Sequence, residues 1–142
     1  MNHSGTIRLE TKRLVLRPFV IEDAGAMFRN WANDPQVTKF LSWEPHKDVE
    51  ETKKILEGWI ASYESKDFYT WAIAWREDEG NVIGSIAVPQ LNQKAGRVTV
   101  GYCLGRKWWG NGIMKEAFAE LIRFFSRWRV PTAWRPCTIR AM

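Results

Sequence analysis

Two glycines separated by one residue, Gly110 and Gly112, stand between a strand pattern and a helix pattern. Apolar and polar side chains alternate from Val98 to Cys103, which is typical of a pleated strand with unlike faces. Beyond the glycines, apolar residues recur at spacings of three and four: Met114, Ala117, Phe118, Leu121, Ile122 and Phe125. This spacing places them on one side of an amphipathic helix. The order strand, glycine turn, helix predicts that the first N–H groups of the helix point outward, where they can bind a phosphate.

Upstream of this unit, the sequence predicts one strand and two helices. The strand lies within Arg8–Phe19, where three apolar residues stand between polar ones and a proline closes the pattern. A first helix is expected over 22–31, because two acidic residues begin it. A second helix is expected over 49–63, with Asp48 as its cap and Glu51 three residues later. The second helix presents one apolar face inward.

A β-hairpin is predicted between the second helix and the glycine turn. Its arms are the aromatic-rich segment Phe68–Trp75 and the segment Val82–Val88, which a polar turn joins. Gly84 lies inside the second arm and marks a bulge or the close approach of another backbone. Pro89–Gly96 is expected to be a loop, and Arg97 opens the next strand, which completes a three-strand antiparallel meander.

Length and composition bound the class of protein. With 142 residues, 45% of them hydrophobic, the chain supports one globular domain with an apolar core. No apolar run is long enough to span a membrane, and the N-terminus lacks a basic and apolar signal, so we expect a cytoplasmic protein. Two cysteines, Cys103 and Cys137, without a CxxC spacing or a nearby histidine, indicate neither a metal site nor a disulfide framework.

Positive charge is concentrated at the C-terminal end. Residues 126–142 contain four arginines and no acidic residue, which leaves only +1 of the net charge of +5 for residues 1–125. The same end contains two prolines and shows neither helix nor strand periodicity. We therefore divide the chain into a folded domain at 1–125 and an irregular basic tail at 126–142.

The glycine turn resembles the signature of the GNAT superfamily of acetyl-CoA-dependent N-acetyltransferases. That signature is Gln or Arg, two residues, and then Gly-x-Gly or Gly-x-Ala, between the fourth strand and the next helix. Lys107, Gly110 and Gly112 match its spacing, with Lys in the first position. The resemblance implies that the loop N–H groups hold the pyrophosphate of acetyl-CoA, with no metal. The cofactor-binding residues that it implies are Tyr102, Leu104, Lys107, Trp108, Trp109, Gly110, Asn111 and Gly112.

The resemblance also gives a role to the end of the strand before the turn. In the family this strand separates from its neighbour, the pantetheine arm pairs with its backbone, and a backbone N–H polarises the thioester carbonyl. Tyr102, Cys103 and Leu104 match these positions. Cys103 is therefore the catalytic candidate through its main chain. Its thiol is not proposed as a nucleophile, because no His or cationic residue adjoins it in sequence.

The N-terminal part is similar to one branch of this superfamily, the RimJ/RimL type that acetylates the N-terminal amines of ribosomal proteins. The segments that carry this likeness are Thr11–Arg17, Asp23–Ala24 and Asn33–Val37. Within the first segment, Arg13 and Arg17 either form a solvated strand face or contact substrate.

Candidates for the acceptor side of the cleft follow the first helix. In the superfamily the first two helices border this cleft, so Trp43 and Glu44 are candidates for binding the amine. The structural alternative makes Trp43 a hydrophobic plug and Glu44 an exposed acid. His46 is either a base or, between a proline and a lysine, a surface loop residue. Thr99 stands where many relatives have a glutamate base, so water or Glu44 is the remaining candidate base.

The C-terminal end departs from the family's pattern. After Phe125 the family has a fifth strand, a helix and two closing strands, whereas this chain ends at Met142. Read in a shifted frame, codons for the tail permit residues similar to the family's fifth strand, and we hypothesise a frameshift. The expected fold class is α+β and GNAT-like: a mixed, mainly antiparallel sheet flanked by helices, without the usual C-terminal strands. Its exposed edge predicts pairing with another chain, as in a homodimer.

Three functions remain open from the sequence. The first is an N-acetyltransferase whose acceptor is a peptide N-terminus, as of a ribosomal protein, or a small amine. The second is a CoA-binding but catalytically impaired fragment of such an enzyme. The third is nucleic-acid binding through the Arg and Trp side chains of the tail. The third is disfavoured because the basic residues are confined to the tail and no RNA-binding motif is present. No membrane partner is expected.

Overall fold

The computed structural model describes five segments of the chain, which are residues 5–38, 45–65, 68–92, 97–126 and 135–141. Within them the strands are β1 (Leu9–Glu10), β2 (Leu14–Arg17), β3 (Tyr69–Trp75), β4 (Gly84–Asn92), β5 (Arg97–Leu104) and β6 (Arg135–Ala141). The α-helices are α1 (Ala24–Met27), α2 (Pro35–Thr38), α3 (Val49–Ser62) and α4 (Ile113–Ser126). Shorter helical turns are η1 (Ile21–Asp23), η2 (Phe28–Ala32) and η3 (Arg106–Trp108).

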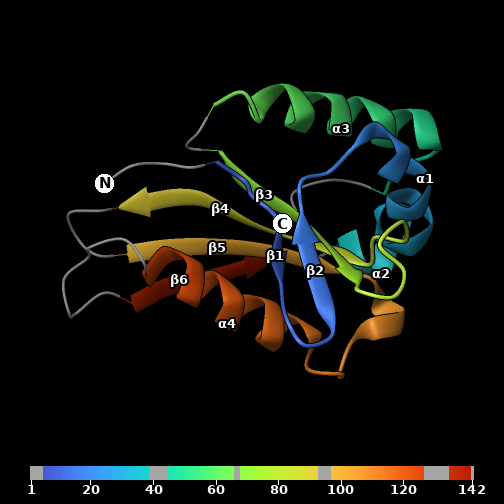
Figure 1. The fold of residues 1–142 in the computed structure, drawn as a ribbon. Helices are drawn as coiled ribbons and strands as arrows, with labels where there is room; N and C mark the ends of the chain where they lie inside the picture. The colour runs from blue at the N-terminus through green and yellow to red at the C-terminus, as the bar shows by residue number, and fades with distance from the viewer. Residues whose placement is uncertain (1–4, 39–44, 66–67, 93–96, 127–134, 142) are drawn as a thin grey trace.

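The strands form one sheet in the order β1-β2-β3-β4-β5-β6. Neighbouring strands from β1 to β5 run antiparallel, and β6 runs parallel to β5. Helices lie on both faces of this sheet (Figure 1). The predicted α+β class, with a mixed and mainly antiparallel sheet flanked by helices, is therefore confirmed.

Each face of the sheet has its own apolar core. Under α4, buried side chains of the helix pack against β2, β3 and β4. The rings of Phe124 and Trp71 meet edge to face, with their centroids 5.5 Å apart. On the other face, α1, η2 and α3 enclose a second cluster that includes Trp31, Leu56 and, from β5, Cys103. Fully burying one large apolar side chain contributes roughly 1.5–3 kcal/mol. Leu104 belongs to the first core and Cys103 to the second, so both cores hold β5, the strand that leads into the glycine turn.

Local signals in the sequence correctly predicted the ends of several elements. Asp48 caps α3, because its Oδ1 accepts a hydrogen bond from the Glu51 N–H at 3.0 Å. The helix expected over 22–31 is a continuous helical stretch from η1 through α1 to η2. The hairpin is formed by β3 and β4, and a Cβ on Gly84 would lie only 2.4 Å from the Cys103 carbonyl oxygen. Gly84 thus marks the close approach of another backbone.

The buried face of α4 is rotated about the helix axis from the predicted apolar face, so that two positions are buried one residue earlier than expected. Ile113, Ala117, Leu121 and Phe124 are buried, whereas Met114 and Phe118 are half-buried. A helix that is apolar over a wide arc permits either orientation, and the position of the sheet selects one.

Two predicted irregular segments are wrong in part, because each contains strand. β4 continues through Pro89 to Asn92, with a register shift between Ala87 and Gln90. The tail at 126–142 contains β6, whose register shift lies next to Pro136. Proline lacks an N–H, and strands tolerate it at bulges and on sheet edges, where no ladder bond is lost. Strand pairing uses backbone groups, so neither segment needed a strand-like side-chain pattern.

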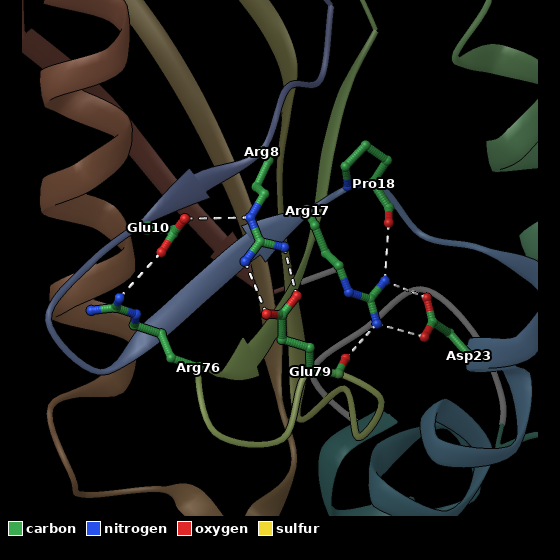
Figure 2. Close-up of polar contacts among 7 residues, drawn as sticks. All are labelled: Arg8, Glu10, Arg17, Pro18, Asp23, Arg76 and Glu79. Atoms are coloured by element: carbon green, nitrogen blue, oxygen red, sulfur yellow. Dashed lines mark hydrogen bonds and ion pairs between the residues drawn. The ribbon is translucent and has the colours of Figure 1, made fainter.

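A network of charged side chains joins the N-terminal strands to the turn between β3 and β4 (Figure 2). Arg8 binds the Glu79 carboxylate with two hydrogen bonds of 2.5 and 2.9 Å. Arg17 binds both oxygens of Asp23 at 2.8 Å and also donates to the Glu79 carbonyl oxygen at 2.6 Å. Arg17 is only 15% exposed and Asp23 only 3%. The interpretation of Arg17 as part of a solvated strand face is therefore wrong.

Candidate functional site

The glycine turn connects β5 to α4 through the short helical turn η3. Gly110 and Gly112 have φ angles of +82° and +72°, a region that side chains other than glycine rarely adopt. The Glu116 N–H bonds the Gly112 carbonyl oxygen at 3.1 Å, which is the start of the helical bonding of α4. The N–H groups of residues 113–115 therefore have no intrahelical acceptor, as at every helix start. The predicted sharp turn before a helix is present.

A cavity of about 440 Å³ lies against this turn. Its walls come from α2, from the end of β5, from the turn and from the first residues of α4. The lining residues are Val37, Tyr102, Cys103, Leu104, Trp108, Trp109, Gly110, Gly112, Ile113, Met114 and Lys115. Seven of these are among the residues predicted from the sequence, so the fold brings most of the predicted site to one place.

The end of β5 presents backbone groups to this cavity. β4 pairs with β5 as far as Leu104, but β6 pairs with it only as far as Tyr102 among the described residues. The Gly105 N–H donates to the Ile83 carbonyl oxygen on the β4 side at 2.8 Å. Since successive N–H groups in a strand face opposite neighbours, the Leu104 N–H faces away from β4. The Leu104 carbonyl oxygen, on that same side, accepts the Trp109 indole N–H at 2.8 Å.

The thiol of Cys103 lies in an environment that disfavours the thiolate. Its side chain is 3% exposed and belongs to the core under α1 and α3. Burial raises the pKa of Cys103 to about 12. The thiol therefore stays protonated near neutral pH, and the thiolate is the nucleophilic form. By the alternation along β5, the Cys103 N–H faces β4, so the N–H that faces away from β4 at this end of the strand is that of the neighbouring Leu104.

Two of the predicted site residues that the structure describes, Lys107 and Asn111, are not part of the cavity wall. Lys107 is exposed, and its Nζ lies 5.6 Å from the centroid of the Trp108 ring. The Asn111 amide donates to the Trp108 carbonyl oxygen at 3.2 Å, which shapes the turn. Trp43 and Glu44 lie outside the described residues.

His46 is not a surface loop residue, contrary to one of the two interpretations of the sequence. The residue is only 9% exposed, and its Nδ1 lies 2.7 Å from the Thr52 Oγ1. The His46 N–H also donates to the Ala32 carbonyl oxygen at 2.8 Å. Burial lowers the pKa of His46, although Glu51 acts in the opposite direction. His46 thus joins α3 to η2 and does not line the cavity described above.

The sequence pointed neither to a polar cluster at the start of α4 nor to four of the wall residues, which are Val37, Ile113, Met114 and Lys115. In this cluster Glu116 accepts hydrogen bonds from the Arg13 Nε at 2.7 Å, from the Arg13 N–H at 3.0 Å and from the Thr11 hydroxyl. Burial acts to raise the pKa of Glu116, but the bonds from Thr11 and Arg13 outweigh it and lower the pKa. The only sequence signal was the acidic residue in the first helical turn, which does not identify its partner.

Comparison with known proteins places this architecture among acetyltransferases. A model of the acetyltransferase (GNAT) domain matches residues 13–138. The uncharacterized N-acetyltransferase p20 of Bacillus licheniformis is 33% identical over 116 residues, and the match covers 82% of this chain and 64% of p20. The alanine N-acetyltransferase of ribosomal protein uS5 from Escherichia coli is 30% identical over 128 residues, with 85% of this chain and 64% of that protein covered.

Solved structures agree on the fold. The apo structure of RimL, a ribosomal-protein alpha-N-acetyltransferase, aligns with a TM-score of 0.70 at 20% identity, covering 85% of this chain and 65% of that one. An acetyltransferase of the GNAT family from Bacillus anthracis aligns with a TM-score of 0.68 at 17% identity, covering 85% and 67%. None of the helices in the described segments has the length and apolar character needed to cross a membrane. The chain spans about 64% of the length of the curated relatives it matches, and it belongs to the acetyltransferase (GNAT) domain family.

Proposed function

We propose that this chain binds acetyl-CoA at the turn around Gly110 and Gly112 and transfers the acetyl group to a primary amine. The observation that carries this proposal is the glycine turn immediately before α4, where Gly110 and Gly112 have positive φ angles. This turn and the end of β5 line the same cavity. A helix start whose N–H groups lack intrahelical acceptors favours a phosphate. The mainly apolar wall suits an uncharged pantetheine arm.

The reaction forms a C–N bond between the amine and the acetyl carbon and breaks the thioester C–S bond. The amine loses one proton and the leaving thiolate gains one. In our proposal the Leu104 N–H, which faces away from β4, donates to the carbonyl oxygen as charge develops there. Trp109 supports that arrangement, because its indole N–H holds the neighbouring Leu104 carbonyl oxygen.

The acceptor in this proposal is the N-terminal amine of a peptide, such as that of a ribosomal protein, or a small amine. Support comes from the likeness to the uS5-alanine N-acetyltransferase of Escherichia coli. Trp43 and Glu44 remain the proposed acceptor contacts. Among the described residues of the cavity wall there is no Asp, Glu or His, so we assign deprotonation of the amine to water or to Glu44.

Two glycine variants test the role of the turn. A Cβ added at Gly110 or at Gly58 meets no atom within 4 Å, but only Gly110 has a positive φ. Gly110→Ala should therefore weaken acetyl-CoA binding by about tenfold through backbone strain alone. Gly58→Ala, in the exposed part of α3, should leave binding unchanged.

The measurements are acetyl-CoA binding by calorimetry, release of the CoA thiol, and the mass of a peptide with an N-terminal Ala or Ser. The proposal requires binding together with an acetylated peptide. Binding without acetylation would select the CoA-binding but impaired alternative. Equal binding by both glycine variants would remove the turn from the site.

A further inference from the structure

A polar cluster at the start of α4 lies next to the turn proposed to hold the diphosphate. Its members are Thr11, Arg13 and Glu116, and it joins the loop between β1 and β2 to the first turn of the helix. Glu116 and Arg13 are 103 positions apart in the sequence. The cluster therefore fixes where α4 begins relative to the sheet.

Arg13 is held from two sides. Its Nε donates to Glu116 at 2.7 Å, and its guanidinium carbon lies 5.7 Å from the centroid of the Trp75 ring. Cations are attracted to the face of an aromatic ring, which orients the guanidinium plane. Arg13 is 39% exposed, so the group is fixed in position while part of it still meets solvent.

The free end of this guanidinium points toward the glycine turn. A Cβ built on Gly112 would lie 3.7 Å from the Arg13 Nη2. Among the described residues, Nη2 donates no hydrogen bond, since the bonds to Glu116 use Nε and the backbone N–H. Nη2 is therefore a donor beside the backbone that turns into α4.

The negative charge of Glu116 affects how an anion can bind at the first turn of α4. A carboxylate in the first turn of a helix stabilises the helix, but it repels a second anion that approaches the same turn. The bonds to Thr11 and Arg13 keep Glu116 ionised, as the lowered pKa indicates. A diphosphate at this turn therefore requires that the Glu116 charge be balanced.

We propose that Arg13 is the positioning residue for the diphosphate of acetyl-CoA: it balances the charge of Glu116, fixes the first turn of α4 and presents Nη2 beside Gly112. This inference rests on the proposed function and adds a second source of positive potential to the loop amides. It applies to the diphosphate alone, so it makes no demand on the acetyl or pantetheine part of the ligand.

The test compares two ligands, acetyl-CoA and S-acetylpantetheine, which lacks the diphosphate. Arg13→Gln should weaken acetyl-CoA binding on the order of tenfold and change S-acetylpantetheine binding by less than about twofold. Arg13→Lys should keep most of the affinity, because it keeps the charge. Arg8→Gln is the matched control, because it removes one arginine charge from a different ion pair, that of Arg8 with Glu79. It should leave the binding of both ligands unchanged.

Two further readouts separate an electrostatic role from a structural one. Adding Glu116→Gln to Arg13→Gln should restore part of the lost acetyl-CoA affinity, because it removes the unbalanced carboxylate. The difference between wild type and Arg13→Gln should also shrink as salt rises to about 1 M, where screening acts within about 3 Å.

Each unfavourable outcome has a definite meaning. Equal weakening for both ligands, or no recovery in the double variant, would show that Arg13 only supports the fold, and the inference would fail. Unchanged acetyl-CoA binding in Arg13→Gln would also overturn it while leaving the proposed function intact. Wild-type protein that does not bind acetyl-CoA at all would overturn the proposed function itself.

Discussion

Arg13 and Arg17 lie four residues apart in one short segment, yet their surroundings differ in kind. Arg17 is 15% exposed, and its two terminal nitrogens bind Asp23, the Pro18 carbonyl oxygen and the Glu79 carbonyl oxygen (Figure 2). Arg13 is 39% exposed and binds Glu116 through Nε and its backbone N–H. Arg17 therefore uses both terminal nitrogens to stabilise the fold, whereas Arg13 retains a donor, Nη2, next to the candidate site.

The comparison predicts its largest effect on stability at Arg17. Arg17→Met leaves the Asp23 carboxylate buried without its partner, and breaking a buried ion pair costs about 3–5 kcal/mol. The free energy of unfolding from urea titration checks this value. Arg8→Met, which breaks an exposed pair with Glu79, serves as the control and should have little effect. If Arg17→Met lowers the free energy of unfolding no more than Arg8→Met does, the buried ion pair contributes no more to stability than the exposed one, and the prediction is wrong.

A smaller effect is expected at Tyr63, which holds the chain just after Arg17. The Tyr63 hydroxyl accepts the Phe19 N–H at 2.9 Å and donates to the Thr70 carbonyl oxygen at 2.7 Å. Tyr63→Phe should therefore cost about 1–3 kcal/mol at neutral pH, because it leaves two backbone groups unpaired.

The Tyr63 hydroxyl should also make the stability of the protein depend on pH in the alkaline range. Burial raises the pKa of Tyr63 to about 12, although the hydrogen bond with Phe19 opposes this effect. A raised pKa means that the hydroxyl contributes its stability fully below pH 10, its ordinary value, and loses it as pH rises toward 12. The stability difference between wild type and Tyr63→Phe, measured from pH 8 to 11, should fall above pH 10. A constant difference would contradict the assignment.

At Arg13 the effect on stability should be smaller still, although we expect a roughly tenfold effect on acetyl-CoA binding. Arg13→Gln should cost about 1 kcal/mol or less, since the pair is partly exposed. The lowered pKa of Glu116 means that its contribution is present above pH 4.5 and is lost as pH falls through the lower native pKa. Glu116→Gln should therefore differ from wild type at pH 6 and converge with it in acid. Chemical denaturation at both pH values checks this, and a pH-independent difference would count against the ion pair.

The smallest effect is expected at Cys103, which lines the cavity beside the glycine turn. Its protonated thiol takes no part in the proposed chemistry, so Cys103→Ala should keep acetyl transfer within about twofold. Iodoacetamide should also label Cys103 slowly at pH 8 in the folded protein, and rapidly after unfolding in urea. Fast labelling of the native protein, or loss of activity in the variant, would restore the thiol as a catalytic group.

Secondary structure and the glycine turn could be predicted because their signals are local. Alternation indicated β5, an aromatic-rich segment followed by a polar turn indicated the hairpin of β3 and β4, and the spacing of apolar residues indicated α4. The cap at Asp48 depends on residues three positions apart, and Gly110 and Gly112 adopt the positive φ that only glycine favours. Seven residues of the cavity wall were expected from the resemblance to the GNAT signature, and they come together because they are close neighbours in the chain.

What only the tertiary structure decided involves contacts between distant residues. The sequence by itself determined the strand, turn and helix that form the candidate loop. The partner of Glu116, the burial of Arg17 and His46, and the place of Val37 in the cavity all arise when elements far apart in the chain pack together. Side-chain periodicity records which face of an element is apolar, but not which element covers it. Pairing of β6 with β5 depends on backbone N–H and C=O groups, which every residue except proline carries, so its side-chain pattern did not predict it.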